Sequence, residues 1–263
     1  MTKIAIASNK GGAGKTTTSV SLAAGLANTD EVLLIDGDPQ GHISLSFGLP
    51  VRSGLFDWLV REMPLHDCTL TGRPANLNIL PGDSLTKTVE RLFGETDEFM
   101  RLVARLRALP HPYVIFDTAA GGLFQEAALA AADQVVIPFR CEALGIDSLF
   151  QTLELVKMLA PCAPVTLLPT AFDMRLSEQK ENLQRIVNEY GEGYGLSPDW
   201  DSYVIRNRTA VAQCVSYGRT IWEHKASGIL DVRRGYSQLI NRVMMLAERE
   251  RIEEGKVLDG NSN

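Results

Sequence analysis

The stretch SNKGGAGKTTT, residues 8–18, stands between an apolar run, KIAIAS at 3–8, and a run with helical spacing at 16–27. Glycines at the junction of a strand and a helix let backbone N–H groups approach phosphate oxygens, and the helix N-terminus adds a positive potential there. The G-K-T ending supplies an ammonium and a hydroxyl beside that cradle. We therefore expect a phosphate-binding loop of the P-loop NTPase type.

This loop assigns roles to individual residues. Lys15 is expected to reach the β and γ phosphates of a nucleotide, and the Thr16 hydroxyl to ligate Mg²⁺. The alternative, a Gly-rich turn with solvated lysines, is disfavoured by the preceding strand and the G-K-T ending. The nucleotide is expected to contact Gly11, Gly12, Ala13, Gly14, Lys15, Thr16 and Thr17.

Short apolar runs alternate with helical patterns along the whole chain. Runs that are apolar at successive positions are typical of strands buried on both faces of a parallel sheet. Their repeated alternation with helices predicts an α/β fold with a doubly wound, mostly parallel sheet flanked by helices. We expect strands at 3–8, 31–36, 77–82, 113–117, 134–139, 165–170 and 202–206, and helices at 16–27, 54–63, 99–109, 123–132, 147–159, 177–190 and 232–250.

Length and composition favour one domain. The 263 residues, 45% of them hydrophobic, are enough for one large core. Because neither a linker nor a repeat is evident, we expect a single domain over 1–250, a polar tail over 251–263 and a loop over 66–76.

Four cysteines without a C-x-x-C pair fit reduced thiols. With no leader pattern and no apolar run that could cross a bilayer, a cytoplasmic protein is expected.

The loop departs from the usual G-x-x-x-x-G-K-[ST] pattern, because Asn9 stands at the first glycine position and Lys10 follows it. Here the sequence resembles the deviant Walker A ATPases, the family of ParA and MinD, from residue 3 to about residue 247. The resemblance implies that ATP and Mg²⁺ close a homodimer. It also implies that Lys10 reaches across the dimer to the partner's phosphates, where its charge stabilises the transferred phosphoryl group.

Three aspartates follow apolar strands. Asp36 and Asp38 lie in LLIDGDPQG, residues 33–41, and Asp117 ends YVIFD, residues 113–117. Ligands of α/β sheets bind at the carboxyl ends of the strands. By resemblance, Asp38 orients the attacking water, Asp36 supports the Mg²⁺ shell and Asp117 holds Mg²⁺ through water. The prolines that usually follow in the family are replaced by Ala119 and Ala120.

The stretch PTAFDMR, residues 169–175, follows the sixth expected strand. The family places its base-reading loop at this point. The resemblance therefore suggests that Thr170 and Asp173 lie near the adenine or across the dimer. The alternative is that both are ordinary loop residues.

The C-terminal third is locally basic although the net charge of the chain is −6. Between residues 203 and 242 there are seven Lys and Arg residues against two acidic ones. A solvated helical face is the alternative to a DNA surface. This region resembles the part of partition ATPases whose arginines hold the DNA backbone, an interaction that ignores sequence and weakens with salt. The candidates are Arg206 and Arg208, with Arg175 and Arg219 as further ones.

The resemblance implies a partition ATPase whose ATP-bound dimer binds nonspecific DNA on the nucleoid. A partner bound at a centromere-like site would stimulate hydrolysis and release it, so that plasmid or chromosome DNA is segregated. A positioning ATPase for a chemoreceptor cluster or microcompartment is one alternative, and a MinD-like regulatory switch without DNA binding is another. The acidic stretch at 244–263 argues against a membrane-binding helix.

Overall fold

Seven strands form one sheet in the order β3-β4-β2-β5-β1-β6-β7 in the computed structural model, which describes residues 1–196 and 199–260. Neighbouring strands are parallel except β3, which pairs with β4 in the antiparallel sense. The predicted α/β fold is thereby confirmed. The strands are β1 (Thr2–Ile6), β2 (Val32–Gly37), β3 (Leu70–Thr71), β4 (Leu77–Leu80), β5 (Tyr113–Thr118), β6 (Gln134–Phe139) and β7 (Val165–Pro169).

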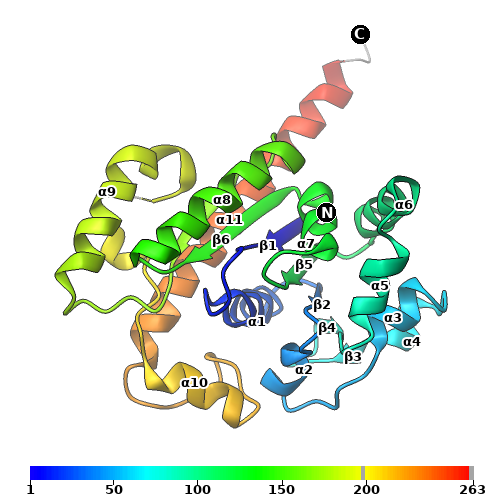
Figure 1. Cartoon of the computed structure of the whole chain (residues 1–263), viewed down its shortest axis with the longest axis horizontal. Coiled ribbons are helices and arrows are strands. Elements are labelled where there is room, and N and C mark those ends of the chain that lie inside the picture. The colour runs from blue at the N-terminus through cyan, green and yellow to red at the C-terminus, as the bar shows by residue number, and fades with distance from the viewer. Residues whose placement is uncertain (197–198, 261–263) are drawn as a thin grey trace.

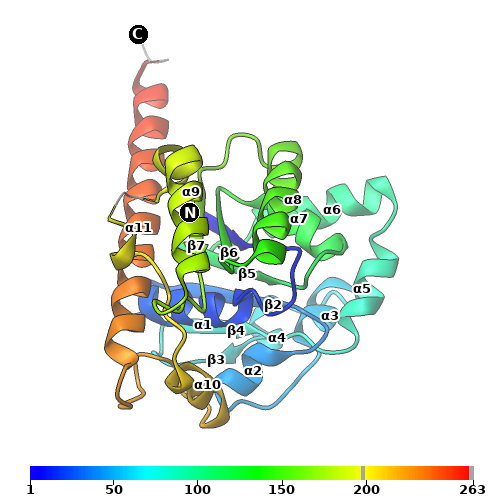
Figure 2. The same cartoon turned by 60° about the vertical axis from the view of Figure 1, so that its left-hand side comes forward.

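Helices cover both faces of the sheet (Figures 1 and 2). Alternate residues of β1 divide between two hydrophobic clusters: Ile4 and Ile6 face one, whereas Ala5 faces the other. The first cluster packs beneath α1 (Lys15–Leu26), α2 (His42–Ser46), α10 (Thr209–Ser216) and α11 (Ile229–Gly260). The second packs beneath α3 (Gly54–Leu59), α5 (Thr86–Leu92), α6 (Thr96–Arg107), α7 (Leu123–Ala131), α8 (Ala143–Leu159) and α9 (Ser177–Tyr194).

The predicted strand at 202–206 is wrong. A short 3₁₀ helix, η1 (Trp200–Ser202), occupies its start, and Arg206 makes only an isolated bridge with Phe172. Val204 and Ile205 are nevertheless buried, and the Ile205 N–H donates to the Pro169 carbonyl at 2.8 Å. The apolar run therefore reflects packing beside the last strand of the sheet rather than a place in its ladder.

The predicted loop at 66–76 is also wrong in part, because it holds the end of α4 (Leu65–Cys68) and the edge strand β3. Leu70 pairs with Ile79 across that edge. Two residues are too few for a periodic pattern, so the strand left no signal in the sequence.

Helix α11 continues to Gly260, ten residues beyond its predicted end, and its last turns project from the body in both views (Figures 1 and 2). Residues 261–263 of the predicted tail lie outside the described residues. The division into a domain and a tail remains a prediction. Among the described helices, none is long and apolar enough to span a membrane.

Candidate active site

The phosphate-binding loop joins β1 to α1 and is shaped by glycines with positive φ angles, 75° at Gly12 and 90° at Gly14. Residues other than glycine rarely adopt positive φ angles, and the missing Cβ of glycine also lets the backbone approach a ligand closely. Gly14 directly precedes α1, whose first N–H groups point into the loop. The half-buried side chains of Thr16 and Thr17 stand in that first turn. The backbone of this loop therefore has the shape that the predicted phosphate cradle requires.

Lys15 crosses its own loop. Its ammonium donates to the carbonyl oxygens of Ser8 at 3.1 Å and Lys10 at 3.2 Å. Burial lowers the pKa of Lys15, whereas the negative charges of Asp117 and Asp38 act in the opposite direction. The side chain is thus held at the position from which the predicted phosphate contact would be made.

Asp36 and Asp117 meet at the carboxyl end of the sheet, as register partners on β2 and β5. Both are fully buried. Asp117 accepts the Ser19 hydroxyl at 2.8 Å through Oδ1, but its buried Oδ2 has no hydrogen-bond partner in the described residues. An unpartnered buried carboxylate oxygen costs free energy unless a cation or donor reaches it. The unpartnered carboxylate oxygen of Asp117 is the kind of ligand that a hard cation such as Mg²⁺ prefers.

Asp36 uses both of its oxygens inside the chain. Oδ1 accepts the N–H of Asp38 at 3.2 Å, and Oδ2 accepts the N–H of Ile43 at 3.1 Å. Burial raises the pKa of Asp36 well above its usual range, as does the neighbouring charge of Asp117, while the two backbone donors lower it. In this structure Asp36 therefore fixes the loop that carries Asp38, and its predicted place in the Mg²⁺ shell remains a prediction.

Asp38 and Lys10 are the two predicted catalytic side chains that the fold leaves available. The half-exposed carboxylate of Asp38 accepts one backbone N–H, that of Gln40 at 2.9 Å. The Lys10 residue is half-buried, and its ammonium makes no hydrogen bond or ion pair within the described part of the chain. Both side chains are free to engage groups that approach from outside the monomer.

A pocket of about 230 Å³ opens beside the phosphate loop. Thr170 lines it, but the one hydrogen of the Thr170 hydroxyl is shared between the carbonyls of Ala13 at 2.7 Å and Phe139 at 3.1 Å, so this residue ties the phosphate loop to the end of β6. The structure does not bring Asp173 into the lining. The lining comprises Gly12, Gly14, Thr17, Thr170, Ala171, Ile205, Arg206, Asn207, Arg208, Val211, Ala212 and Tyr236.

A larger hollow of about 860 Å³ lies on the surface between α3, α5 and α6. Its lining contains no glycine-rich loop, the α6 N-terminus on its wall carries Glu95 and Glu98, and Arg105 is engaged with the carbonyls of Trp58 and Leu59. The smaller pocket is lined by Gly12, Gly14 and Thr17 of the phosphate loop. Of the two hollows, it is therefore the one that adjoins the predicted phosphate-binding loop.

The comparisons with known proteins agree with this geometry. A family model described as "AAA domain" (AAA_31) matches residues 1–162. The chromosome partitioning protein ParA of Caulobacter vibrioides is 31% identical over 270 residues, which cover 96% of this chain and 96% of that protein. The chain belongs to the ParA family of P-loop ATPases.

Two solved structures have the same fold. McdA of Cyanothece in its ATP complex superposes with a TM-score of 0.79 at 23% identity, covering 93% of this chain and 96% of McdA. The septum site-determining protein MinD of Pyrococcus horikoshii, complexed with Mg-ADP, gives 0.72 at 21% identity, covering 93% of this chain and 96% of MinD. The predicted family, fold and ATPase activity are thus confirmed for this ParA-family chain.

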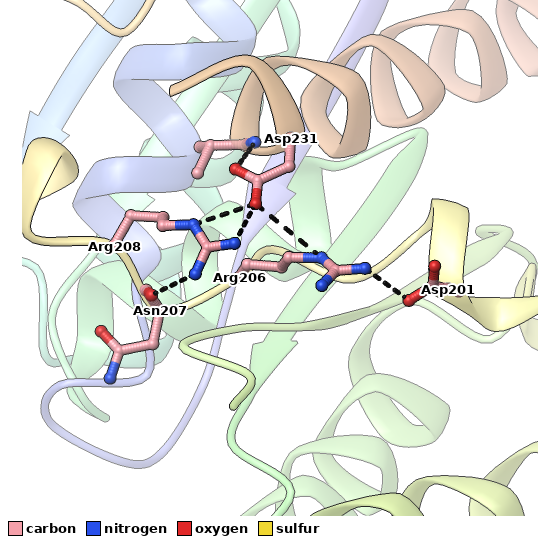
Figure 3. A network of polar contacts seen from close by, with 6 residues as sticks. Asp201, Arg206, Asn207, Arg208 and Asp231 are labelled. Atoms are coloured by element: carbon pink, nitrogen blue, oxygen red, sulfur yellow. Dashed lines mark hydrogen bonds and ion pairs between the residues drawn. The ribbon is translucent and has the colours of Figure 1, made fainter. Parts of the chain in front are cut away.

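The predicted DNA-binding arginines of this ParA-family chain are engaged with aspartates (Figure 3). Arg206 contacts Asp201 at 2.8 Å and lies 3.9 Å from Asp231. Arg208 donates to Oδ2 of Asp231, the oxygen that Arg206 approaches, through Nε at 2.9 Å and also through Nη2. The four side chains carry no net charge together. We call them the arginine cluster: Asp201, Arg206, Arg208 and Asp231.

The other two candidates differ from these. Arg175 is exposed and forms a bidentate pair with Asp173, and this hydrogen-bonded contact holds the pKa of Asp173 well below its usual range. Arg219 is exposed and has no ion pair among the residues that the structure describes.

Sequence reasoning missed the pocket residues Asn207 and Tyr236, since neither is charged and neither belongs to a recognised motif.

The buried Asp117 predicts a pH-dependent stability. Burial raises its pKa to about 6, against the opposing effects of the Ser19 and Thr16 hydroxyls and the Lys15 charge. An unfolded aspartate has a pKa of about 3.9, so its contribution to stability is fully present below about pH 4 and is lost as the pH rises through about 6. Asp117→Asn should therefore raise the free energy of unfolding by about 1–3 kcal/mol at pH 8 and change it little at pH 4.

Urea unfolding of both proteins at the two pH values measures this effect. Asp97→Asn, at an exposed position of α6, is the control for loss of one carboxylate. An equal change in stability at both pH values would contradict the assignment of a raised pKa to Asp117.

Proposed function

We propose that this chain is a DNA-partition ATPase, in which ATP and Mg²⁺ close a homodimer that binds DNA without sequence preference. A partner protein stimulates hydrolysis and thereby releases the dimer. The relationship to a chromosome partitioning protein at 31% identity over nearly the whole chain supports DNA, rather than a protein assembly, as the cargo. The C-terminal part of α11 carries both acidic and basic residues, among them Glu248, Arg249 and Arg251. A membrane-binding helix would instead have a basic polar face, so this composition favours DNA binding over a MinD-like switch.

Each residue of the site has a part in this proposal. Lys15 and the first turn of α1 bind the phosphates, and Asp38 orients the attacking water. Thr16 and Asp117 would hold Mg²⁺, which supplies Lewis-acid polarisation of the phosphoryl oxygens when bound. Lys10 reaches the nucleotide of the partner subunit. A cation delivered there stabilises charge on the transferred group, so that nucleotide and dimer depend on each other.

One observation carries the link between nucleotide and DNA: Arg206 and Arg208 line the same pocket as Gly12 and Gly14. A ligand in this pocket touches the segment that holds both arginines. Asp201 and Asp231 compete with DNA phosphates for the guanidinium groups of Arg206 and Arg208, since a guanidinium pairs with carboxylate as well as with phosphate oxygens. DNA binding then requires this exchange of partners, and nucleotide in the pocket is placed to influence it.

The arginine cluster yields a pair of opposite predictions. Arg206→Ala with Arg208→Ala should weaken binding of the ATP-bound dimer to random duplex DNA by at least about tenfold and reduce the salt slope by about four, for two contacts in each subunit. Asp231→Asn removes a competing carboxylate and should tighten binding about three- to tenfold. Fluorescence anisotropy at several salt concentrations measures both.

Two controls accompany this experiment. Because the two arginines line the nucleotide pocket, ATP affinity is measured for each variant and DNA binding is tested at saturating ATP. Glu181→Gln, at an exposed position on α9, removes one negative charge away from the cluster. If the double alanine variant binds ATP and DNA as the wild type does, these arginines are not the DNA contacts.

A further inference from the structure

A buried amide connects the end of β5 to the loop that carries Lys10. Gln125, on α7, is 1% exposed. Its Nε2 donates to Oδ1 of Asn9 at 2.8 Å. Its Oε1 lies 3.2 Å from the Thr118 hydroxyl, whose one hydrogen is shared with the closer Ile6 carbonyl at 2.9 Å. Thr118 directly follows Asp117, and Asn9 directly precedes Lys10. One side chain thus bridges two segments that lie 109 positions apart in the sequence, since 118 − 9 = 109.

The backbone on either side of Lys10 is fixed at further points. The N–H of Asn9 donates to Oγ1 of Thr152 at 3.1 Å, and the hydroxyl of Thr152 donates to the Ser148 carbonyl at 2.8 Å. The carbonyl of Lys10 itself accepts from Lys15. The Lys10 side chain, in contrast, makes no polar contact within the described residues. The loop is therefore held rigidly while the ammonium is left free to project.

A buried polar bridge of this kind needs a reason, because apolar side chains of the same size would fill the space without requiring partners. Its position suggests one. Positioning a charge to about half an ångström matters most where that charge must meet a group on another molecule. Lys10 is such a charge if it acts across a dimer, whereas Lys15 acts within its own subunit.

We propose that Gln125 is a positioning residue for Lys10, acting through Asn9, and that it aligns the loop for ATP-dependent dimerisation. This inference rests on the proposed role of Lys10 in the partner's site. Gln125 also contacts Thr118, so that the segment following Asp117 and the loop carrying Lys10 move as one unit. ATP binding by the monomer does not depend on the bridge, but the closure of two monomers does.

The test compares Gln125→Met with Gln134→Met. Gln134 is also a buried glutamine, 2% exposed, and it donates one hydrogen bond, to the Val243 carbonyl at 3.2 Å at the opposite end of the sheet. Both variants lose a buried amide hydrogen bond, and Gln134→Met also removes an Oε1 that has no partner among the described residues, so the melting temperature of each variant is measured beside its dimerisation. We expect only Gln125→Met to weaken ATP-dependent dimerisation, by about tenfold or more, with monomer affinity for a fluorescent ATP analogue within about threefold.

A double-mutant cycle identifies the partner of Gln125. Asn9→Ala should weaken dimerisation as much as Gln125→Met does, and the double variant should be no worse than either single one. Sedimentation velocity with ATP measures each species. If Gln125→Met dimerises like Gln134→Met, or if the two effects add fully, the proposal is overturned.

Lys10→Ala separates this proposal from the one on which it rests. If Lys10→Ala dimerises normally with ATP, the proposed role of Lys10 is wrong. If Lys10→Ala fails to dimerise while Gln125→Met dimerises normally, only the positioning role of Gln125 is wrong. Should Gln125→Met not fold, Asn9→Ala, on the half-exposed loop, still tests the same hydrogen bond.

Discussion

Lys15→Ala is expected to abolish ATP binding at micromolar nucleotide, with an affinity at least about 100-fold lower than that of the wild type. The ammonium is buried and held over the loop by the carbonyls of Ser8 and Lys10, where the phosphates would be bound. A charge-assisted hydrogen bond to phosphate contributes about 1.5–3 kcal/mol, and a lysine that reaches two phosphates makes more than one. Titration with a fluorescent ATP analogue measures the loss.

Two observations decide whether the loss comes from the phosphate contact. Lys180→Ala, at an exposed position of α9, should bind ATP as the wild type does. Lys15→Ala removes the donor to the Ser8 and Lys10 carbonyls, so its melting temperature is measured beside ATP binding to show that the variant is folded under the assay conditions. ATP affinity within about threefold of the wild type would show that Lys15 is not the phosphate ligand.

Asp38→Ala is expected to reduce ATP turnover by about 100-fold or more while ATP binding is retained. Positioning or activating the attacking water contributes about 10²–10⁴ to the rate in enzymes of many classes. Asp38 is half-exposed at the carboxyl end of the sheet, and one of its oxygens remains available beyond its bond to Gln40. Because hydrolysis is what ends the closed state, the ATP-bound dimer should accumulate.

Phosphate release and sedimentation velocity, each with ATP, measure turnover and dimer for this variant. Asp97→Ala on the exposed side of α6 serves as the matched carboxylate control. Normal turnover in Asp38→Ala would refute the role given to this residue. Slow turnover without a dimer would mean that Asp38 is needed for dimerisation rather than for orienting the attacking water.

The nucleotide site could be predicted from sequence because its groups are local. The loop, the start of α1 and the strand-ending carboxylates each occupy one short stretch, and parallel strands bring their carboxyl ends to one edge of the sheet. Asp36 and Asp117, 81 positions apart since 117 − 36 = 81, become register partners for this reason. The sequence does not reveal that Asp36 uses both oxygens to hold the following loop.

The arginine cluster and the Gln125 bridge could not be predicted, because each depends on tertiary pairing of distant residues. Counting charges between 203 and 242 gives an excess of basic residues, but the count does not reveal that Asp231, one of the two acidic residues in this range, lies directly against Arg208 in the fold. Gln125 looks like any polar residue of a helix, since its partner Asn9 is 116 positions away. The false strand at 202–206 has the same origin, for burial beside β7 imitates the apolar pattern of a strand.

The most direct test of the account is binding of the wild-type chain to random-sequence duplex DNA with ATP, with ADP and without nucleotide, at low and moderate salt. The account predicts binding with ATP alone, which weakens steeply as salt rises because arginines contact phosphates. Equal binding in all three nucleotide states would contradict the link between the pocket and the arginine cluster. Absence of binding in every state would contradict the proposal that DNA is the surface on which this ATPase acts.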